Sequence, residues 1–231
     1  MNKDFILPLF LLLALSLGCS KISELTEGTG RTRNTSNENS EPPKPGDDAP
    51  ASGEFAPSSD PKVDIEKMAD RFMSLKSFRA EMDGDGQTPM KTDLEFVTPD
   101  RYRIKTGNTM EMIVIGKTSY MKMGSKWQKM SLPLDSTISD MRSAFNKEGM
   151  KWFSDVKYTG DDTVDGKPAY VYTYHNKGPG AGVGENDSKV WIAKGDGLPI
   201  KIEAIYKTGN LKSMKIEYDY ETPVVIEPPV N

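Results

Sequence analysis

The chain has 231 residues, with 30 Lys and Arg against 34 Asp and Glu, so its formal net charge is −4 at pH 7. This acidic balance argues against nucleic acid as a partner, because nucleic-acid recognition needs a basic face. One histidine and one cysteine exclude catalysis that needs two histidines, most zinc sites and any disulfide within the chain. The length allows one ordinary domain plus a tail.

The N-terminus has the pattern of a secretory signal. Lys3 precedes an apolar run over residues 5–17, which is about as long as a signal-peptide core and too short to span a bilayer as a helix. Residues 15–19 (Leu-Ser-Leu-Gly-Cys) resemble the bacterial lipobox, with Ser16 where leucine is usual. The resemblance implies that residues 1–18 are a cleaved signal peptide and that Cys19 carries acyl chains such as palmitate. The alternative is an ordinary secretory signal with a chance cysteine.

Residues 19–61 are predicted to be a lipidated cysteine followed by a disordered tether. Thr29–Asp48 is polar and rich in Ser, Asn, Pro and Gly, so it cannot bury enough apolar surface to offset the entropy of ordering. Ser20 is not the aspartate that marks inner-membrane retention in some bacteria with two membranes. This favours an extracytoplasmic location on the outer membrane, facing the periplasm.

The domain is expected to span residues 62–231 and to open with a helix over about 62–76. Asp60 followed by Pro61 is a typical helix start. Apolar side chains then recur at helical spacing, at Ile65, Met68, Ala69, Phe72 and Leu75.

From Phe78 onward the apolar period changes to two, which predicts strands separated by Gly- and Asn-containing turns. The predicted strands cover residues 79–83, 92–97, 101–105, 110–115, 119–123, 126–130, 155–159, 167–174, 188–193, 199–206 and 212–218. Between the sixth and seventh, residues 135–153 predict one or two amphipathic helices. Short turns between successive strands favour an antiparallel sheet.

Four motifs suggest chemistry, but a structural interpretation is simpler for each. The glycine cluster at 178–184 precedes a strand and not a helix, so it lacks the geometry of a phosphate-binding loop. Asp83–Gly86 does not continue as an EF-hand and is interpreted as a turn, as is Asp161-Asp162. His175 has no evident triad partners. We therefore expect a protein that is not an enzyme and has no cofactor or metal.

The order of elements and several local sequences resemble the LolA/LolB lipoprotein-sorting proteins and the related LppX/LprG lipoprotein carriers. The segments that carry this resemblance are Phe72–Phe78, Phe96–Arg103, Val190–Glu203, Lys215–Tyr220 and Ile226–Pro229. The resemblance covers about residues 62–228. It implies a mainly β fold: a half-open, curved antiparallel sheet of about eleven strands, with two or three helices covering its concave face.

The resemblance also implies an apolar cavity that binds or transports a lipid or the acyl chains of a lipoprotein. Methionine suits such a lining because it is flexible and polarizable, and the chain has 13. The candidate ligand-binding residues are Met82, Leu94, Phe96, Met110, Met112, Met121, Met123, Ile138, Met141, Phe145, Trp191 and Ile202. The same residues are compatible with a dry core.

Two other functions remain as alternatives at this point. A sensor or interaction module of the same fold would bind an envelope protein through its exposed turns. An extracytoplasmic hydrolase is the weaker alternative, since no nucleophile with a base is recognisable.

Overall fold

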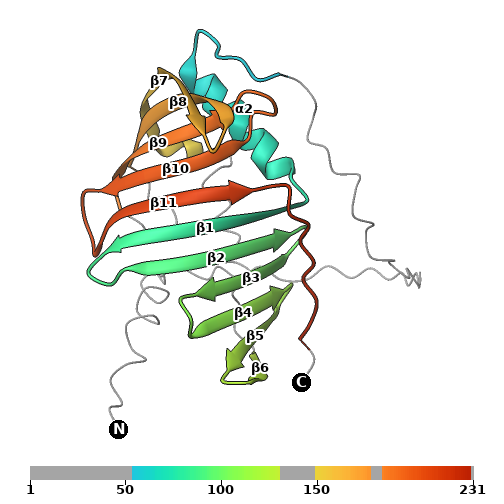
Figure 1. Ribbon diagram of the computed structural model, residues 1–231. Coiled ribbons are helices and arrows are strands. Elements are labelled where there is room, and N and C mark those ends of the chain that lie inside the picture. Colours follow the sequence, from blue (N-terminus) through green and yellow to red (C-terminus); the bar gives the residue numbers. More distant parts are fainter. Residues whose placement is uncertain (1–53, 131–148, 178–183, 230–231) are drawn as a thin grey trace, which may run out of the picture. The chain divides into compact units, whose positions relative to one another are not determined.

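One antiparallel sheet dominates the computed structural model, which describes residues 54–130, 149–177 and 184–229 (Figure 1). Within these ranges there is one α-helix, α2 (Pro61–Ser74), and one 3-10 turn, η1 (Gly149–Trp152). The strands are β1 (Ser77–Gly86), β2 (Met90–Val97), β3 (Arg101–Thr106), β4 (Met110–Ile115), β5 (Thr118–Met123), β6 (Lys126–Met130), β7 (Phe153–Val164), β8 (Lys167–Asn176), β9 (Asn186–Ala193), β10 (Pro199–Tyr206) and β11 (Leu211–Asp219).

The sheet consists of two meanders that meet in its middle. Its strand order is β6-β5-β4-β3-β2-β1-β11-β10-β9-β8-β7, so the first and last strands of the chain are neighbours. In the pairing of β1 with β11, Ala80 lies opposite Tyr218 and Met82 opposite Ile216. The outermost strands are β6 and β7, and the sheet is open.

The edge strand β7 is irregular. Its pairing with β8 shifts register between Ser154 and Lys157 and again between Tyr158 and Gly160. Asp155 has a φ of 54° and Gly160 a φ of 128°, values that bend an extended strand locally.

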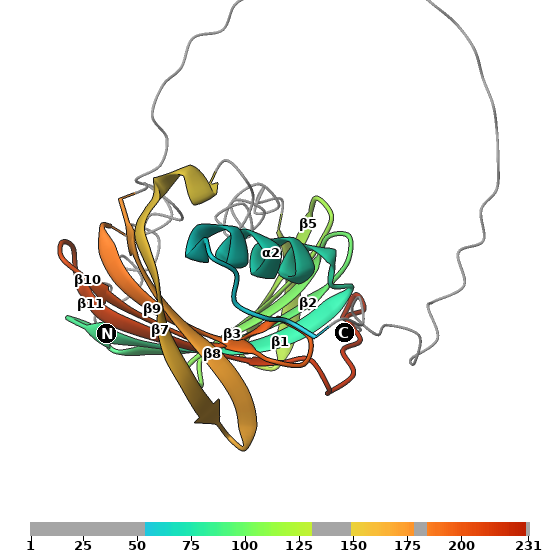
Figure 2. The same cartoon turned by 90° about the horizontal axis from the view of Figure 1, so that it is seen from above.

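Helix α2 lies in the hollow of the curved sheet (Figure 2). Asp60 caps its start by accepting a hydrogen bond from the Lys62 N–H at 3.0 Å, and Pro61 occupies the first turn. The apolar side of the helix buries Ile65, Met68, Ala69 and Phe72. These residues pack on the sheet in two core clusters, with side chains that include Tyr172, Val190, Ile192, Ile202, Phe78 and Phe96.

A buried carboxylate fixes α2 to the sheet. Asp64 is fully buried, and its Oδ2 accepts hydrogen bonds from the Tyr172 hydroxyl at 3.0 Å and from the Ser58 N–H at 2.9 Å. Burial and the hydrogen bond to Asp64 raise the pKa of Tyr172 above its usual range. The helix position is therefore set by hydrogen bonds to a buried carboxylate as well as by apolar packing.

The predicted fold class is confirmed. All eleven predicted strands are present, and the predicted helix is α2. The largest difference is at β7, which was predicted over residues 155–159 and runs from Phe153 to Val164. Asp161-Asp162, interpreted from sequence as a turn, is therefore part of this strand, because β8 pairs with it. The described residues contain fewer helices than the two or three expected, and most of the predicted 135–153 insertion lies outside them. Asp83–Gly86, interpreted from sequence as a turn, is the end of β1, because β2 and β11 pair with it on both sides.

The segment predicted as a tether contributes one core residue. Phe55 is 2 % exposed, and the guanidinium of Arg71 lies 5.5 Å from the centroid of its ring. Gly197, with a φ of +69°, packs so closely that a Cβ there would lie 2.6 Å from Phe55. Residues 48–231 form a compact unit that holds every described helix and strand, so this segment is the unit for measurements on the isolated domain.

We expect Tyr172→Phe to lower the free energy of unfolding of the domain by about 1–3 kcal/mol, because the buried Asp64 carboxylate loses a hydrogen-bond donor. Urea denaturation followed by circular dichroism measures the change. Tyr158→Phe is the matched control, since Tyr158 is 39 % exposed, and its effect should stay within about 0.5 kcal/mol. Equal effects of the two substitutions would contradict the proposed role of Asp64.

Candidate functional site: an apolar face beyond the helix

The face of the sheet that carries α2 is apolar well beyond the area that the helix covers. Because strand residues alternate between faces, the register identifies which side chains share a side. Leu94, Ile104 and Met112 pack against the same core cluster as Phe72 of α2, so they lie on the helix side.

Two rows of side chains cross the strands on this side. We call them the apolar rows. The first runs from β5 to β11 through Met121, Met112, Ile104, Leu94, Ala80 and Tyr218. The second runs from β4 to β10 through Met110, Thr106, Thr92, Met82, Ile216 and Ile202.

Burial varies along the apolar rows, and Thr92 is buried whereas Leu94 and Tyr218 are half-buried. Ala80 and Ile202 are buried, whereas Met112 and Met121 are half-buried. The two hydroxyls in the second row, Thr92 Oγ1 and Thr106 Oγ1, lie 3.2 Å apart and hydrogen-bond to each other. The rows contain no charged side chain, and their hydroxyl pair is satisfied internally. This surface therefore favours an apolar ligand.

The opposite face of the same strands is charged. Glu95 on β2 lies between two arginines, 3.3 Å from Arg79 Nη2 and 2.9 Å from Arg103 Nη1. Further cross-strand pairs join Lys91 to Glu81 at 2.8 Å and Lys215 to Asp83 at 3.7 Å. Cross-strand pairs of opposite charge stabilise a solvated sheet surface.

Two hollows of about 440 and 360 Å³ lie on the charged face. The larger is lined mainly by charged side chains, among them Arg79, Glu95 and Arg103. The smaller lies between Trp127 on β6 and the C-terminal residues Val225 and Pro228. The charged walls of the larger hollow make it a poor site for an acyl chain, whereas the smaller has both apolar and charged walls.

Eight of the predicted ligand-binding residues lie on the helix side of the sheet. They are Met82, Leu94, Phe96, Met110, Met112, Met121, Met123 and Ile202. Phe96 and Ile202 belong to the core clusters, whereas Met123 at the end of β5 is 59 % exposed. Cys19, Ile138, Met141 and Phe145 lie outside the described residues.

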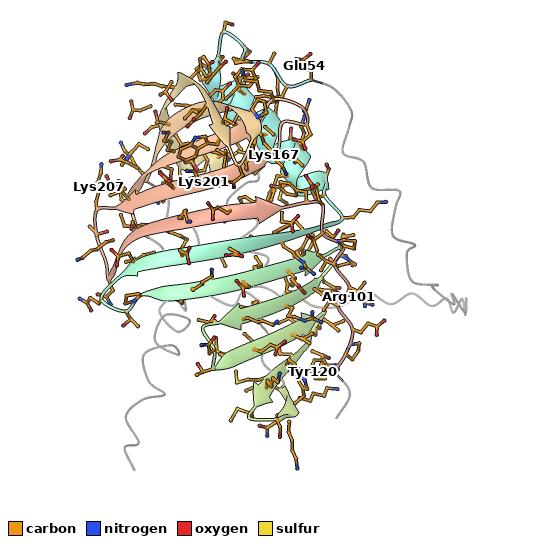
Figure 3. The ribbon with its side chains drawn as sticks, in the orientation of Figure 1. Glu54, Arg101, Tyr120, Lys167, Lys201 and Lys207 are labelled. Carbon is orange, nitrogen blue, oxygen red and sulfur yellow. The ribbon has the colours of Figure 1, made fainter. Side chains whose placement is uncertain are left out.

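Trp191 lies on the other face. Its Nε1–H donates to Asp162 Oδ2 at 2.8 Å, and the ammonium groups of Lys189 and Lys201 lie 4.3 and 3.8 Å from its ring centroid. Lys201, which is opposite Trp191 in the register, extends from β10 (Figure 3). The tryptophan packs in a small separate cluster with Val171.

Sequence reasoning did not select Ile104 and Ile216, which complete the apolar rows. The signal for Ile104 was present in the alternation of Tyr102 and Ile104 between charged neighbours. Ile216 belongs to a one-sided stripe with Met214 and Tyr218 that the sequence reveals but does not assign to a face.

His175 is buried and lies between two exposed carboxylates. Its Nδ1 lies 2.6 Å from Asp187 Oδ1, and its Nε2 lies 3.0 Å from Glu185 Oε1. The hydrogen bond with His175 lowers the pKa of Asp187. Both ring nitrogens therefore face carboxylates, an arrangement that leaves neither free to take a proton from a nucleophile.

Neither a metal site nor a membrane-spanning helix is found in the described part of the chain. His, Cys, Asp and Glu side chains there form no group of three or more that would hold a metal ion. No helix in those residues is long and apolar enough to cross a membrane.

The fold is similar to that of two mycobacterial proteins, one of them a lipoprotein. The lipoprotein LppX of Mycobacterium tuberculosis superposes with a TM-score of 0.57 at 15% identity, over 72% of this chain and 98% of LppX. LprF from Mycobacterium bovis gives a TM-score of 0.55 at 14% identity, over 78% of this chain and all (100%) of LprF. These similarities confirm the predicted LolA/LppX-like fold, whereas neither known protein families nor curated proteins match the sequence.

Alkaline conditions should destabilise the domain. Tyr174, stacked on Phe153 with 4.4 Å between ring centroids, is 6 % exposed, and burial raises its pKa to about 12. An unfolded tyrosine ionises near pH 10, so between about pH 10 and 12 the unfolded chain loses a proton that the folded chain keeps. The stabilising contribution is present below pH 10 and is lost as the pH rises to 12.

Urea denaturation at about pH 8 and about pH 11 measures this effect. We expect the free energy of unfolding to fall with pH, and Tyr174→Phe to remove about 1.4 kcal/mol of the fall, because pH 11 is about one unit above the pKa of an unfolded tyrosine. The difference in the free energy of unfolding between the wild type and Tyr174→Phe at about pH 8 measures the effect of the lost hydroxyl, and it is subtracted from the difference at about pH 11. An unchanged pH dependence in Tyr174→Phe would show that this tyrosine does not contribute.

Proposed function

We propose that the protein is a bacterial lipoprotein, anchored by acylated Cys19, that binds or transports a lipid or the acyl chain of a lipoprotein without catalysis. The observation that supports this proposal is the continuation of the apolar rows past helix α2, to half-buried Met112 and Met121. The signal-like N-terminus and the LppX-like fold support an extracytoplasmic location, which we place on the outer membrane facing the periplasm.

The dimensions of the apolar rows suit an acyl chain. Neighbouring strands lie about 4.8 Å apart, so the first row, over the six strands from β5 to β11, is about 24 Å long. One leaflet of a bilayer has a hydrocarbon depth of about 15 Å, half of the core thickness, so the row has room for an extended chain. Each methylene buried there contributes about 0.8 kcal/mol.

The residue types on the rows suit ligands of variable shape. Met82, Met110, Met112 and Met121 all lie on this face. Unbranched thioether side chains adopt many conformations at low cost, so they fit chains that differ in length or unsaturation. Since the rows carry no charge, we place the headgroup of the ligand outside them.

Displacement of a fluorescent fatty acid from the 48–231 domain tests the binding face. Met112→Gln keeps the length of the side chain but places an amide in the first apolar row, and we expect roughly ten-fold weaker binding because that amide loses water. Glu111→Gln, the preceding residue on the charged face, is the matched control and should bind as the wild type does.

Equal binding by both variants would refute the assignment of the ligand to the apolar rows. Loss of binding in Glu111→Gln alone would place the ligand on the charged face. Urea denaturation of each variant verifies that the domain remains folded.

Cys19→Ser should release the full-length protein from the membrane fraction and abolish its labelling with radioactive palmitate. The physical reason is that a thioether-linked lipid cannot form on a serine hydroxyl, and a soluble tether retains nothing in the bilayer. Ser20→Ala is the matched control and should stay labelled. Membrane retention and labelling of Cys19→Ser would exclude the anchor.

The alternative function is an envelope sensor or protein-interaction module of the same fold. The charged face favours it, because the Nε atoms of Arg79 and Arg103 are buried there without a hydrogen-bond partner. A domain that binds no acyl ligand, but retains a stoichiometric protein partner through these arginines, would replace the lipid-binding proposal with this one.

A further inference from the structure

The hairpin of β5 and β6 concentrates positive charge in an acidic chain. Residues 117–130 contain four lysines and no Asp or Glu, whereas the whole chain has a net charge of −4. Lys122 pairs with Glu111 of the neighbouring strand at 3.0 Å. Lys117, Lys126 and Lys129 are exposed, and no ion pair within the described residues neutralises them.

The tip of this hairpin is apolar. Met123 is 59 % exposed, and it directly precedes the turn at Gly124, which has a φ of 63°. On the charged side of the hairpin, the Lys122 ammonium lies 5.7 Å from the ring centroid of half-buried Trp127. Lys126 lies opposite Met123 in the register, and an exposed apolar side chain beside a lysine is typical of segments that bind at the surface of a membrane.

The hairpin also lies at one end of the apolar rows. Met121 of β5 pairs with Met112 of β4 and is the last member of the first row. In Figure 1, β5 and β6 are at the end of the sheet remote from α2, and Tyr120 marks β5 in Figure 3. A bilayer in contact with this hairpin would therefore lie beside the least covered part of the apolar face.

We propose that the β5–β6 hairpin docks the domain on a membrane surface that contains anionic phospholipids. Lys117, Lys126 and Lys129 bind the headgroups, and the Met123 side chain enters the interface between headgroups and acyl chains. Charge complementarity selects the anionic surface, and the exposed methionine distinguishes a bilayer from an acidic protein or a nucleic acid. The docking itself does not require that the apolar rows hold a ligand.

Vesicle binding by the 48–231 domain, which lacks Cys19, tests the proposal in the absence of any lipid anchor. We expect the domain to sediment with vesicles that contain phosphatidylglycerol, and not with vesicles of pure phosphatidylcholine. Added salt should release it, because exposed charges are screened. Lys126→Gln with Lys129→Gln should weaken binding about thirty-fold, since each lysine near an anionic surface contributes about five-fold.

Two matched controls separate this hairpin from general effects of charge and apolarity. Lys157→Gln with Lys212→Gln changes the net charge by the same amount on β7 and β11, and should bind as the wild type does. Met123→Ser should weaken binding, whereas Ile205→Ser, at a residue on β10 that is 66 % exposed, should not.

A fluorescent label reports which part of the domain touches the bilayer. Since the sole cysteine of the chain is Cys19, Ser125→Cys provides a unique site at the hairpin tip of the 48–231 domain, and Lys212→Cys provides one on β11. We expect an environment-sensitive dye at position 125, but not at 212, to shift to shorter wavelength on addition of phosphatidylglycerol vesicles.

Equal binding to both kinds of vesicle, equal loss in the two lysine double variants, or a dye shift at position 212 alone would each overturn the proposal. Fatty-acid displacement without vesicles is measured separately, so failure of docking and failure of acyl binding remain distinguishable.

Discussion

The pairing of β1 with β11 is the interaction on which the rest of the structure depends. In chain order β1 is the first strand and β11 the last, yet they are neighbours in the middle of the sheet. Their register sets Ala80 opposite Tyr218 and Met82 opposite Ile216, which joins the apolar rows of the two meanders. A slip of one residue would turn the apolar side chains of one meander toward the charged face of the other.

This register gives one sheet two chemically distinct surfaces. On one side of the sheet, apolar side chains pack under α2 and continue past it. On the other side, Glu95 forms ion pairs with Arg79 and Arg103 on the two neighbouring strands. The helix is fixed over only part of the apolar side, because its buried Asp64 is bound to Tyr172 of β8. Within the described residues no helix lies over the remainder of the apolar side, and it is this part that the proposed ligand would occupy.

The local pattern of apolar and polar residues explains which parts of the fold and of the candidate site could be predicted from the sequence. The strands were found because apolar and polar residues alternate, as in Tyr102 and Ile104 between charged neighbours. Trp191 was grouped with the lining residues because it lies in the run Val190-Trp191-Ile192, which is buried throughout and gives no information about faces. The pairing of β1 with β11 was not predicted, since it joins strands that are far apart in the sequence and depends on the curvature of the whole sheet.

The irregular strand β7 affects how copies of this protein can associate. An open sheet has two edges, and each presents unpaired N–H and C=O groups to which another chain can add as a further strand. Both described edges resist this addition: β7 through its two register shifts and the positive φ of Asp155, β6 through its short length and its lysines. The open sheet is thereby protected from edge-to-edge association with other copies.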